Sequence, residues 1–499
     1  MKSKKLATLL LTLVFALGLI PMSAFAAQRD VAEGSTASIT VENAVENDVL
    51  AAYKVVDITY NAAKNTLSHE WNSLFADYFS QTNSFTNSAK REYTVDEFAA
   101  LTKDSAELKT LLAGLPNYIA TKSIHPVGTQ TVAANSTATF ANLEMGEYFI
   151  RPTSSTSVYQ LMLQKVEPTV SGGKYVIDDL TFGAKREEVA VDKTANKTSV
   201  TKKEKVTYTI TVDIPTYASK AVDKSFYVSD LLPNGLTIDP ASIKVQIDGT
   251  DVDTAAYTLD TTAVAEYTFK LSVSAAQYTA SWSANGGKQL VITYTATLNN
   301  NDTTAVNVKQ TNTVTFDYSN YPYVENSHNQ KTDTVDVTTF AIKIDKYVKN
   351  DEDAKLANAK FDLYRTATQA EVNAGSAVKI PHTTVNGIKL ESDLVTDANG
   401  TATFAKYEAN GTNYDYYLVE TRAPSGYNIL DNAVKVNFTN TEVEATAGVY
   451  TVKVPNSSGI QLPITGGTGT VIFTIIGIAL MVGAVVLFVV SRKKAKESK

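Results

Sequence analysis

The middle of the chain alternates apolar and polar residues with a period of two. The apolar positions are Val206, Tyr208, Ile210 and Val212 in KVTYTITVDIP and Leu290, Ile292, Tyr294 and Ala296 in QLVITYTATL. Successive side chains of a strand point to opposite faces, so each segment predicts a β-strand with one buried face. Because several such segments are separated by turn-forming stretches, residues 184–338 are predicted to form an Ig-like β-sandwich.

Residues 27–183 combine strand patterns with a helical insertion. Strand-like segments such as ASITVENA and VLAAYKVVDITY precede two helical stretches, and ATFANLEMGEYFIRP and YQLMLQKV follow them. The first helical stretch has Thr94 three residues before Glu97, the spacing of a capping box. The second places four leucines on one helical face: Leu108, Leu111, Leu112 and Leu115. A β-rich N-terminal domain with helices is expected.

Residues 339–461 return to the strand pattern, in FAIKIDKYV, KFDLYR, TATFAKY, YDYYLVET, AVKVNF and GVYTVKV. TATQAEVNAG predicts a helical or looped excursion between them. The phrases VAVDKT around Lys193 and IKIDKY around Lys346 are parallel, and we interpret them as equivalent first strands of two related sandwiches. The predicted fold class is therefore mainly β, with tandem β-sandwich domains.

The N-terminus carries the pattern of a secretory signal peptide. Lys2, Lys4 and Lys5 are followed by an apolar run over residues 6–20 and by Ala24-Phe25-Ala26, an A-x-A cleavage site. Residues 1–26 are predicted to be removed on export. The alternative is an N-terminal anchor helix, although the apolar run is short for a membrane span.

The C-terminus carries a membrane-span pattern. Residues 470–490 contain no charge and are long enough to cross a bilayer as a helix. The basic residues that follow are Arg492, Lys493, Lys494, Lys496 and Lys499. By the positive-inside rule this tail stays in the cytoplasm, so the preceding residues are predicted to be exported.

Composition narrows the possible functions. The formal net charge is −7 and no basic patch suggests nucleic-acid binding. The four histidines are widely spread, without metal-ligand spacing, and we find no P-loop, G-x-G-x-x-G or Ser/His/Asp signature. No metal, cofactor or enzymatic activity is predicted. The chain also has no cysteine, which is unusual outside the cell, so large cores or another crosslink must replace disulfides.

Residues 462–499 resemble the cell-wall sorting signal of Gram-positive surface proteins. The pentapeptide Leu462-Pro463-Ile464-Thr465-Gly466 stands directly before the apolar span and the basic tail. In that family a sortase cleaves between the threonine and the glycine, here Thr465 and Gly466, and joins the threonine carboxyl group to an amine. The alternative is an ordinary single-pass anchor.

Further motifs resemble sortase-assembled pilins. YYLVETRAPSGYNIL is similar to their E-box, AKLANAKFDLYR to a phrase of Cna-B-type domains, and VPNSSGIQLPITGG to the pilin ending. Asn358 stands where that Cna-B phrase usually has glycine. In the order of its domains and in both of its termini, the chain resembles a backbone, or major, pilin subunit.

The resemblance implies intramolecular isopeptide crosslinks. A lysine on the first strand attacks an asparagine amide on the last strand, ammonia leaves, and a neighbouring Glu or Asp acts as the acid. Burial lowers the pKa of the lysine and raises that of the acid, and proximity favours the attack. The implied trios are Lys346, Asn456 and Glu420 in the third block and Lys193, Asn312 and Asp230 in the second. Lys343 competes with Lys346 but would face the other side of its strand. The alternative for Lys193 and Lys346 is an ordinary solvated lysine at a strand edge.

Polymerisation in this family needs a pilin-motif lysine near the end of the first domain. The corresponding region, YVIDDLTFGAKREE, offers Lys185, although Gly183-Ala184 replaces the family's Tyr-Pro and no tryptophan precedes it. Lys174 or another lysine remains an alternative. Lys54 and Glu147 have suitable residue types for a crosslink in the first domain, without further support.

The resemblance implies a covalently polymerised shaft subunit at the cell wall, with a transient membrane anchor before sortase cleavage. The implied partners are pilus-specific and housekeeping sortases, identical subunits, minor pilins and peptidoglycan; host surface ligands stay open, and no nucleic acid is expected. The alternatives are a monomeric wall-anchored adhesin or minor pilin, and a wall-attached enzyme, which the absence of a catalytic signature disfavours.

Overall fold

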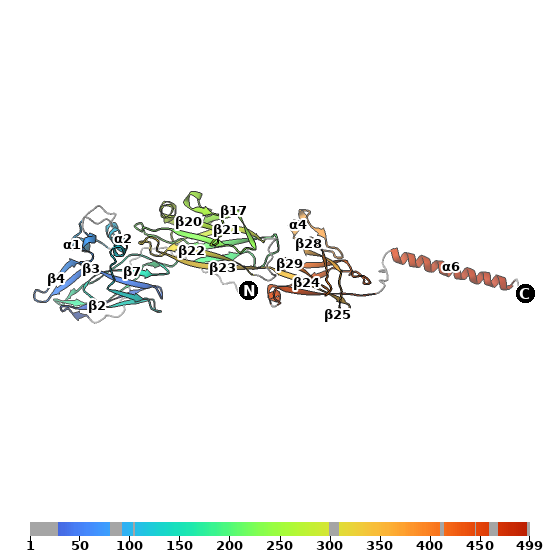
Figure 1. Cartoon of the computed structure of the whole chain (residues 1–499), viewed down its shortest axis with the longest axis horizontal. Coiled ribbons are helices and arrows are strands. Elements are labelled where there is room, and N and C mark those ends of the chain that lie inside the picture. Colours follow the sequence, from blue (N-terminus) through green and yellow to red (C-terminus); the bar gives the residue numbers. More distant parts are fainter. Residues whose placement is uncertain are drawn as a thin grey trace.

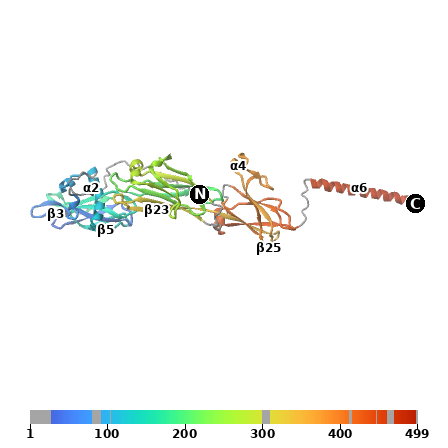
Figure 2. The same cartoon turned by 45° about the horizontal axis from the view of Figure 1, so that its top comes forward.

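The computed structural model describes residues 28–79, 92–102, 105–298, 309–409, 414–444, 446–458 and 468–496. Three β-rich blocks follow one another along the long axis of the molecule, and a single helix lies beyond the third (Figures 1 and 2). The predicted mainly β fold with tandem sandwiches is confirmed. The predicted signal peptide, residues 1–26, lies outside the described residues.

The first block contains two main sheets and a helical insertion. One sheet is formed by β4 (Thr66–Trp71), β3 (Val49–Asn61), β7 (Gly146–Ser154) and β9 (Met162–Val166), with β5 (Gly128–Thr131) pairing with β3. The other has the order β12 (Leu180–Gly183), β2 (Thr36–Glu42), β6 (Ala138–Glu144). A small third sheet joins β1 (Arg29–Asp30), β11 (Lys174–Ile177) and β10 (Thr169–Ser171).

The described part of the first block contains three helices, η1 (Ala76–Phe79), α1 (Val95–Ala99) and α2 (Ala106–Thr121). Two of them, α1 and α2, are those that the sequence predicted, and η1 was not predicted. The capping box of Thr94 and Glu97 is present at the start of α1, and Leu108, Leu111, Leu112 and Leu115 are all buried on α2. The insertion therefore packs onto the core through the predicted leucine face.

The middle block is a sandwich of two five-stranded sheets. One has the order β14 (Val191–Ala195), β15 (Lys205–Asp213), β21 (Gln289–Leu298), β17 (Leu236–Ile247), β18 (Thr250–Asp251). The other has the order β19 (Thr258–Asp260), β20 (Phe269–Val273), β16 (Phe226–Leu231), β22 (Lys309–Ser319), β23 (His328–Thr338). The helical turns η2 (Thr254–Ala256), α3 (Ala275–Gln277), η3 (Tyr278–Trp282) and η4 (Ser283–Asn285) lie between strands. The eight apolar positions singled out in β15 and β21 are all buried, which confirms the period-two prediction.

The third block is a second sandwich. One sheet holds β25 (Asp351–Lys355), β24 (Phe340–Val348) and β29 (Thr401–Tyr407), with β32 (Val449–Asn456) pairing with β24. The other has the order β27 (Val378–Lys379), β28 (Asn386–Val395), β26 (Lys360–Thr366), β30 (Tyr416–Arg422), β31 (Val434–Val436). TATQAEVNAG contains the short helix α4 (Gln369–Asn373), and α5 (Asn440–Glu444) precedes β32.

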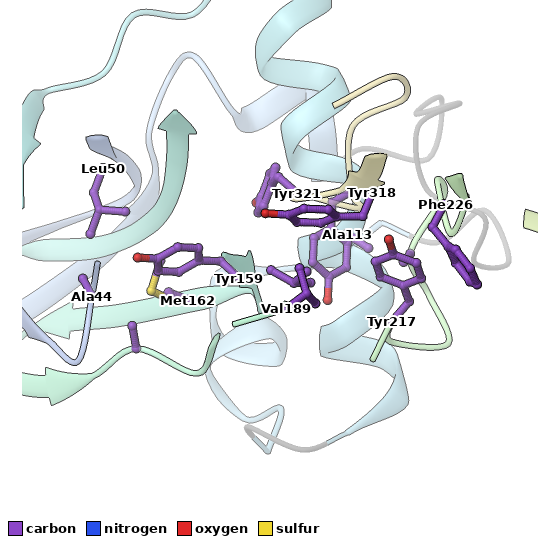
Figure 3. Packing of buried hydrophobic residues seen from close by; sticks show 14 of the residues in the cluster. Ala44, Leu50, Ala113, Tyr159, Met162, Val189, Tyr217, Phe226, Tyr318 and Tyr321 are labelled. Atoms are coloured by element: carbon purple, nitrogen blue, oxygen red, sulfur yellow. The ribbon is translucent and has the colours of Figure 1, made fainter. Parts of the chain in front are cut away.

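One hydrophobic core runs through the first two blocks, and the third block has a main core of its own and a small second cluster of Tyr364, Ile380 and Val419. In Figure 3 Tyr159 and Met162 of the first block lie in the same apolar cluster as Tyr318 and Tyr321 of the middle block. Strands β8 (Val158–Tyr159) and β13 (Arg186–Glu187) pair close to this junction. The boundaries at 183/184 and 338/339 stay predictions.

Helix α6 (Thr468–Lys496) forms at the C-terminus and contains one candidate membrane span, Phe473–Arg492, with a mean hydropathy of 2.9 and none of it buried against the protein. A fully exposed apolar helix of this length fits a bilayer better than water. Its position overlaps the predicted span of residues 470–490.

Candidate functional site

The third block brings Lys346, Asn456 and Glu420 together in its core. Lys346 lies on β24 and Asn456 on β32, which pair in parallel with Val348 opposite Asn456. The Lys346 ammonium donates to Asn456 Oδ1 and lies 3.2 Å from Glu420 Oε1. Asn456 Nδ2 donates to both carboxylate oxygens of Glu420, at 2.9 and 3.2 Å. The three groups thus form a closed triangle of direct contacts.

Burial adjusts the chemistry of this trio. The side chains of Lys346 and Glu420 are 0% exposed, and the ammonium lies 5.6 Å from the ring centroid of Phe361. Burial lowers the pKa of Lys346 to about 8, against the opposing effect of Glu420. Near neutral pH the neutral amine that a nucleophilic attack requires is therefore far more populated than in an ordinary lysine.

Local backbone contacts fix the position of each group. The Lys346 N–H donates to the carbonyl of Gly400 at 2.8 Å, and its carbonyl accepts from Leu356 N at 3.0 Å. Gly400 has φ +70°, and a Cβ there would lie 2.3 Å from the Lys346 carbonyl oxygen. Only glycine fits this turn. On the acid side, Leu430 N donates to Glu420 Oε2 at 2.8 Å.

The middle block brings Lys193, Asp230 and Asn312 into one buried cluster. Lys193 lies on β14, whereas Asp230 on β16 and Asn312 on β22 belong to the facing sheet. Lys193 and Asp230 form an ion pair whose side chains are both 0% exposed. Burial lowers the pKa of Lys193 and raises the pKa of Asp230, so it favours the neutral form of both groups.

A tyrosine completes this second cluster. The Tyr294 hydroxyl donates to Asp230 Oδ1 at 2.8 Å and accepts from Asn312 Nδ2 at 2.6 Å and Lys193 Nζ at 3.2 Å. The alternating pattern predicted only that Tyr294 lies on the buried face of its strand. Its hydroxyl, on a strand face that is otherwise aliphatic, was the one feature of the sequence that could have indicated a role, because a buried hydroxyl needs a hydrogen-bond partner.

Two details of the expected arrangement are wrong for the middle block. Asn312 lies on β22, which β23 follows, so it is not on the last strand. Strand β14 is an edge strand paired antiparallel to β15, whereas β24 is flanked by β25, β29 and β32. The parallel phrases around Lys193 and Lys346 therefore do not mark equivalent strand positions. A crosslink in the middle block would join the two sheets rather than neighbouring strands.

The other lysines are placed as follows. Lys185 is exposed and follows β12, and its backbone carbonyl accepts from Gln160 N at 2.9 Å. Its neighbour Ala184 is buried, so the backbone of this segment packs against the rest of the domain. Lys174 pairs with Asp30 at 3.2 Å. Lys343 is half-buried on β24, three residues from Lys346.

Lys54 and Glu147 do not meet. The ammonium of Lys54 pairs with Asp57 and Glu144, each at 2.9 Å, and Glu147 pairs with Lys165 at 3.2 Å. The predicted sortase residues Leu462, Pro463, Thr465 and Gly466 lie outside the described residues.

A further polar cluster surrounds His328, which the sequence analysis did not single out. Its Nε2 lies 3.2 Å from Ser225 Oγ, and its Nδ1 contacts Asp317, the connectivity of a Ser-His-Asp triad. However, Nε2 also lies 3.0 Å from Asp223. Although burial opposes protonation, the two carboxylates raise the pKa of His328 to about 9. A histidine charged at neutral pH does not act as a general base, so this cluster is structural.

Comparison with known families identifies two segments. Residues 341–451 match the SpaA prealbumin-like fold domain, and residues 454–497 match the LPXTG cell wall anchor motif. The anchor motif and the apolar helix α6 indicate a protein anchored at the cell wall.

Curated relatives carry fimbrial and surface-protein names. The fimbrial subunit type 1 of Actinomyces viscosus is 27% identical over 333 residues, covering 58% of this chain and 61% of the relative. The trypsin-resistant surface T6 protein of Streptococcus pyogenes is 24% identical over 365 residues, covering 58% of this chain and 65% of the relative. The chain thus spans less than two thirds of the length of these relatives.

Solved structures of major pilins share the fold. The T6 backbone pilin of Streptococcus pyogenes superimposes with a TM-score of 0.59 at 20% identity, over 82% of this chain and 81% of the pilin. The major pilin SpaD of Corynebacterium diphtheriae gives 0.55 at 17% identity, over 86% and 99%. The major pilin SpaA of the same organism, whose pilus assembly is described with stabilizing isopeptide bonds, gives 0.51 at 19% identity, over 85% and 100%.

Proposed function

We propose that this chain is the structural shaft subunit of a covalently polymerised surface pilus, strengthened by two intramolecular Lys–Asn isopeptide bonds. The observation that carries the proposal is the occurrence of two fully buried Lys–acid–Asn clusters in consecutive sandwiches of a cysteine-free, wall-anchored chain. Lys346 and Lys193 are the nucleophiles, Asn456 and Asn312 the electrophiles, and Glu420 and Asp230 the acids.

Self-crosslinking accounts for the cost of burying these charges. A buried ion pair is a weak source of stability, because desolvation offsets the attraction between the charges. If the pair is consumed by amide formation, both charges disappear and a covalent bond remains. Lys346 and Asn456 are 110 residues apart, and closing a loop of that size contributes about 4–5 kcal/mol through the entropy of the unfolded chain.

The crosslinks also suit a fibre under tension. The Lys346–Asn456 bond connects the neighbouring parallel strands β24 and β32, which are the first and last strands of the third block along the sequence. Pulling on the chain ends would load this bond before the hydrogen bonds of the sheet. Resistance to proteases is expected for the same reason, in line with the name of the streptococcal relative.

In the proposed assembly, sortase cleaves between Thr465 and Gly466 and joins the Thr465 carboxyl group to Lys185 of the next subunit. Lys185 is exposed, and within the described residues its ammonium forms no ion pair; Lys174 is also exposed and its ammonium pairs with Asp30 at the surface. A free, accessible amine is what an inter-subunit bond requires. The proposed partners are sortases, identical subunits and minor pilins, with peptidoglycan at the base of the pilus. The proposed role is structural and not enzymatic.

The experiment is electrophoresis of wall extracts from the producing cells in denaturant. A shaft subunit gives a ladder of bands from covalent polymers, which boiling in denaturant does not dissociate. Lys185→Ala should leave monomer only, and the matched variant Lys174→Ala should keep the ladder. Monomer alone in the unmodified strain would contradict the shaft function.

A second candidate function is a monomeric wall-anchored adhesin or minor pilin. The observation that favours it is the departure of residues 175–188 from the family's pilin motif, with Gly183-Ala184 in place of Tyr-Pro. The same electrophoresis decides between the two functions, because an adhesin gives one band whatever stands at position 185.

A further inference from the structure

The two buried clusters differ in how the acid reaches the amide. In the third block Glu420 contacts both reacting partners directly, 3.2 Å from Lys346 Nζ and 2.9 Å from Asn456 Nδ2. In the middle block Asp230 contacts Lys193, but no hydrogen bond joins it to Asn312 within the described part of the chain. Glu420 therefore contacts both the lysine and the leaving nitrogen, whereas Asp230 contacts only the lysine.

The Tyr294 hydroxyl occupies the gap between Asp230 and Asn312. It donates to Asp230 Oδ1 at 2.8 Å and accepts from Asn312 Nδ2 at 2.6 Å. Aspartate is one methylene group shorter than glutamate, and the tyrosine hydroxyl supplies the missing reach. Asn312 Nδ2 is the atom that leaves as ammonia, and Asn312 Oδ1 has no hydrogen-bond partner among the described residues.

We propose that Tyr294 is a catalytic residue of the middle crosslink, passing a proton from Asp230 to the departing nitrogen of Asn312. This inference rests on the proposed function, because it presupposes that Lys193 and Asn312 form an isopeptide bond. The third block needs no such residue, because Glu420 already touches the leaving nitrogen.

The proton transfers balance without any further reactant. The Lys193–Asp230 pair starts as neutral amine and carboxylic acid, and the amine nitrogen forms a bond to Asn312 Cγ. Once the amine has added to Cγ, Nδ2 becomes basic and the two hydrogen bonds of Tyr294 reverse their direction. As the Cγ–Nδ2 bond then breaks, Nδ2 takes the Tyr294 proton, the tyrosine takes the Asp230 proton, and ammonia leaves. The Asp230 carboxylate then accepts the proton released by the new amide nitrogen, which restores the acid.

The environment of Tyr294 suits a relay that stays protonated between transfers. Burial, reinforced by Asp230, raises the pKa of Tyr294 well above its usual value. Its ring is held by Tyr208 and Phe269, with centroids 5.4 and 5.1 Å away. Phenylalanine would pack equally well at this position, so packing does not explain the presence of the hydroxyl.

The test compares the two crosslinks inside one molecule. The full chain is produced as wild type and as Tyr294→Phe, and samples taken at intervals are digested with trypsin. Mass spectrometry then measures the crosslinked fraction at each site. We expect formation of the Lys193–Asn312 bond to slow by about 10²-fold in Tyr294→Phe, the usual loss of one general acid, while the Lys346–Asn456 bond forms at its normal rate.

Tyr208→Phe is the matched control. It removes the hydroxyl from the ring stacked on Tyr294, which lies near Asn312 but makes no hydrogen bond to Asp230 among the described residues. We expect this variant to crosslink at the wild-type rate. Equal slowing in both variants, or no slowing in Tyr294→Phe, would overturn the relay. Absence of the Lys193–Asn312 bond in the wild type would instead refute the crosslink assignment on which the relay rests.

A second measurement avoids substitution, in case Tyr294→Phe does not fold. Uniform replacement of tyrosine by 3-fluorotyrosine makes the phenol a stronger acid without removing it. The relay predicts faster crosslinking in the middle block relative to the third block, where no tyrosine hydroxyl contacts the described trio. An unchanged ratio of the two rates would overturn the proposal.

Discussion

At the residue scale, the chemistry depends on burying a lysine beside an acid and an amide. The sequence motifs were sufficient to single out Lys346, Glu420 and Asn456, because each stands in a recognisable phrase. They could not reveal Tyr294, since a tyrosine on the buried face of a strand is already explained by packing. They could not reveal His328 either, because Asp223 and Asp317 approach it only after the middle block folds.

Glu420→Gln should abolish the Lys346–Asn456 bond and leave the middle bond intact. Glutamine keeps the size of the side chain but can neither take the lysine proton nor deliver one to the leaving nitrogen. The melting temperature of the third block should fall as well, since about 4–5 kcal/mol of loop-closure stabilisation is lost. Peptide mass spectrometry and calorimetry measure the two effects.

Glu352→Gln is the control for that substitution. Glu352 is an exposed glutamate of the same block that pairs with Lys453, and its replacement should change neither the crosslink nor the melting temperature. Normal crosslinking in Glu420→Gln would exclude Glu420 as the acid.

His328 should make the stability of the middle block depend on pH above neutrality. Its pKa is raised by Asp223 and Asp317 from 6.5 to about 9, so this stabilisation is complete below pH 6.5 and is lost as the pH rises through about 9. Allowing for partial exposure, the loss is about 1–2 kcal/mol. Denaturant unfolding at pH 6 and pH 10 measures it. In His328→Gln that difference should shrink, and an equal difference in both proteins would contradict the assignment.

At the element scale, strand periodicity located most of the elements but not their partners. Alternation marks the buried face of β24 and β32, yet nothing in it says that they pair in parallel. For the same reason the sequence placed Asn312 on a last strand, whereas β23 continues the sheet beyond it. Pairing is decided by tertiary packing, which a local pattern does not record.

Gly400→Ala should disturb the third crosslink from a distance. The added Cβ would collide with the Lys346 carbonyl at 2.3 Å, and alanine is also strained at φ +70°. We expect a destabilisation of about 1–3 kcal/mol and slower formation of the Lys346–Asn456 bond, because β24 must shift. Unfolding and peptide mass spectrometry measure both.

Gly375→Ala separates strain from collision. Gly375 has φ +72° but nothing within 4 Å of the added Cβ. The substitution should therefore destabilise the protein only through backbone strain and leave the crosslink rate unchanged. Equal effects at the two glycines would show that contact with Lys346 is irrelevant.

At the scale of the whole molecule, the two junctions between blocks differ in kind. The first and middle blocks share one hydrophobic core. The middle and third blocks meet through polar contacts, such as Lys202 with Glu391 at 3.1 Å and Lys197 with Glu408 at 3.4 Å. The sequence could not predict this difference, because alternation identifies a buried face but not the block that covers it.

The polar junction should loosen with salt and the apolar one should not. The partly exposed pair of Lys202 and Glu391 weakens as ionic strength rises, whereas apolar burial does not. Raising the salt from 0.05 to 1 M, or the substitution Glu391→Gln, should broaden the distance distribution between labels on the middle and third blocks. Labels across the first junction provide the control, and equal broadening at both junctions would contradict this distinction.

The mass of the exported segment, residues 27–463, unfolded in denaturant, tests self-crosslinking most directly. Formation of both bonds predicts a mass lower than that of the sequence by two molecules of ammonia, and Glu420→Ala should restore one of them. A deficit of one ammonia that Glu420→Ala abolishes would leave the Lys193–Asn312 assignment wrong. A mass equal to that of the sequence would contradict self-crosslinking altogether.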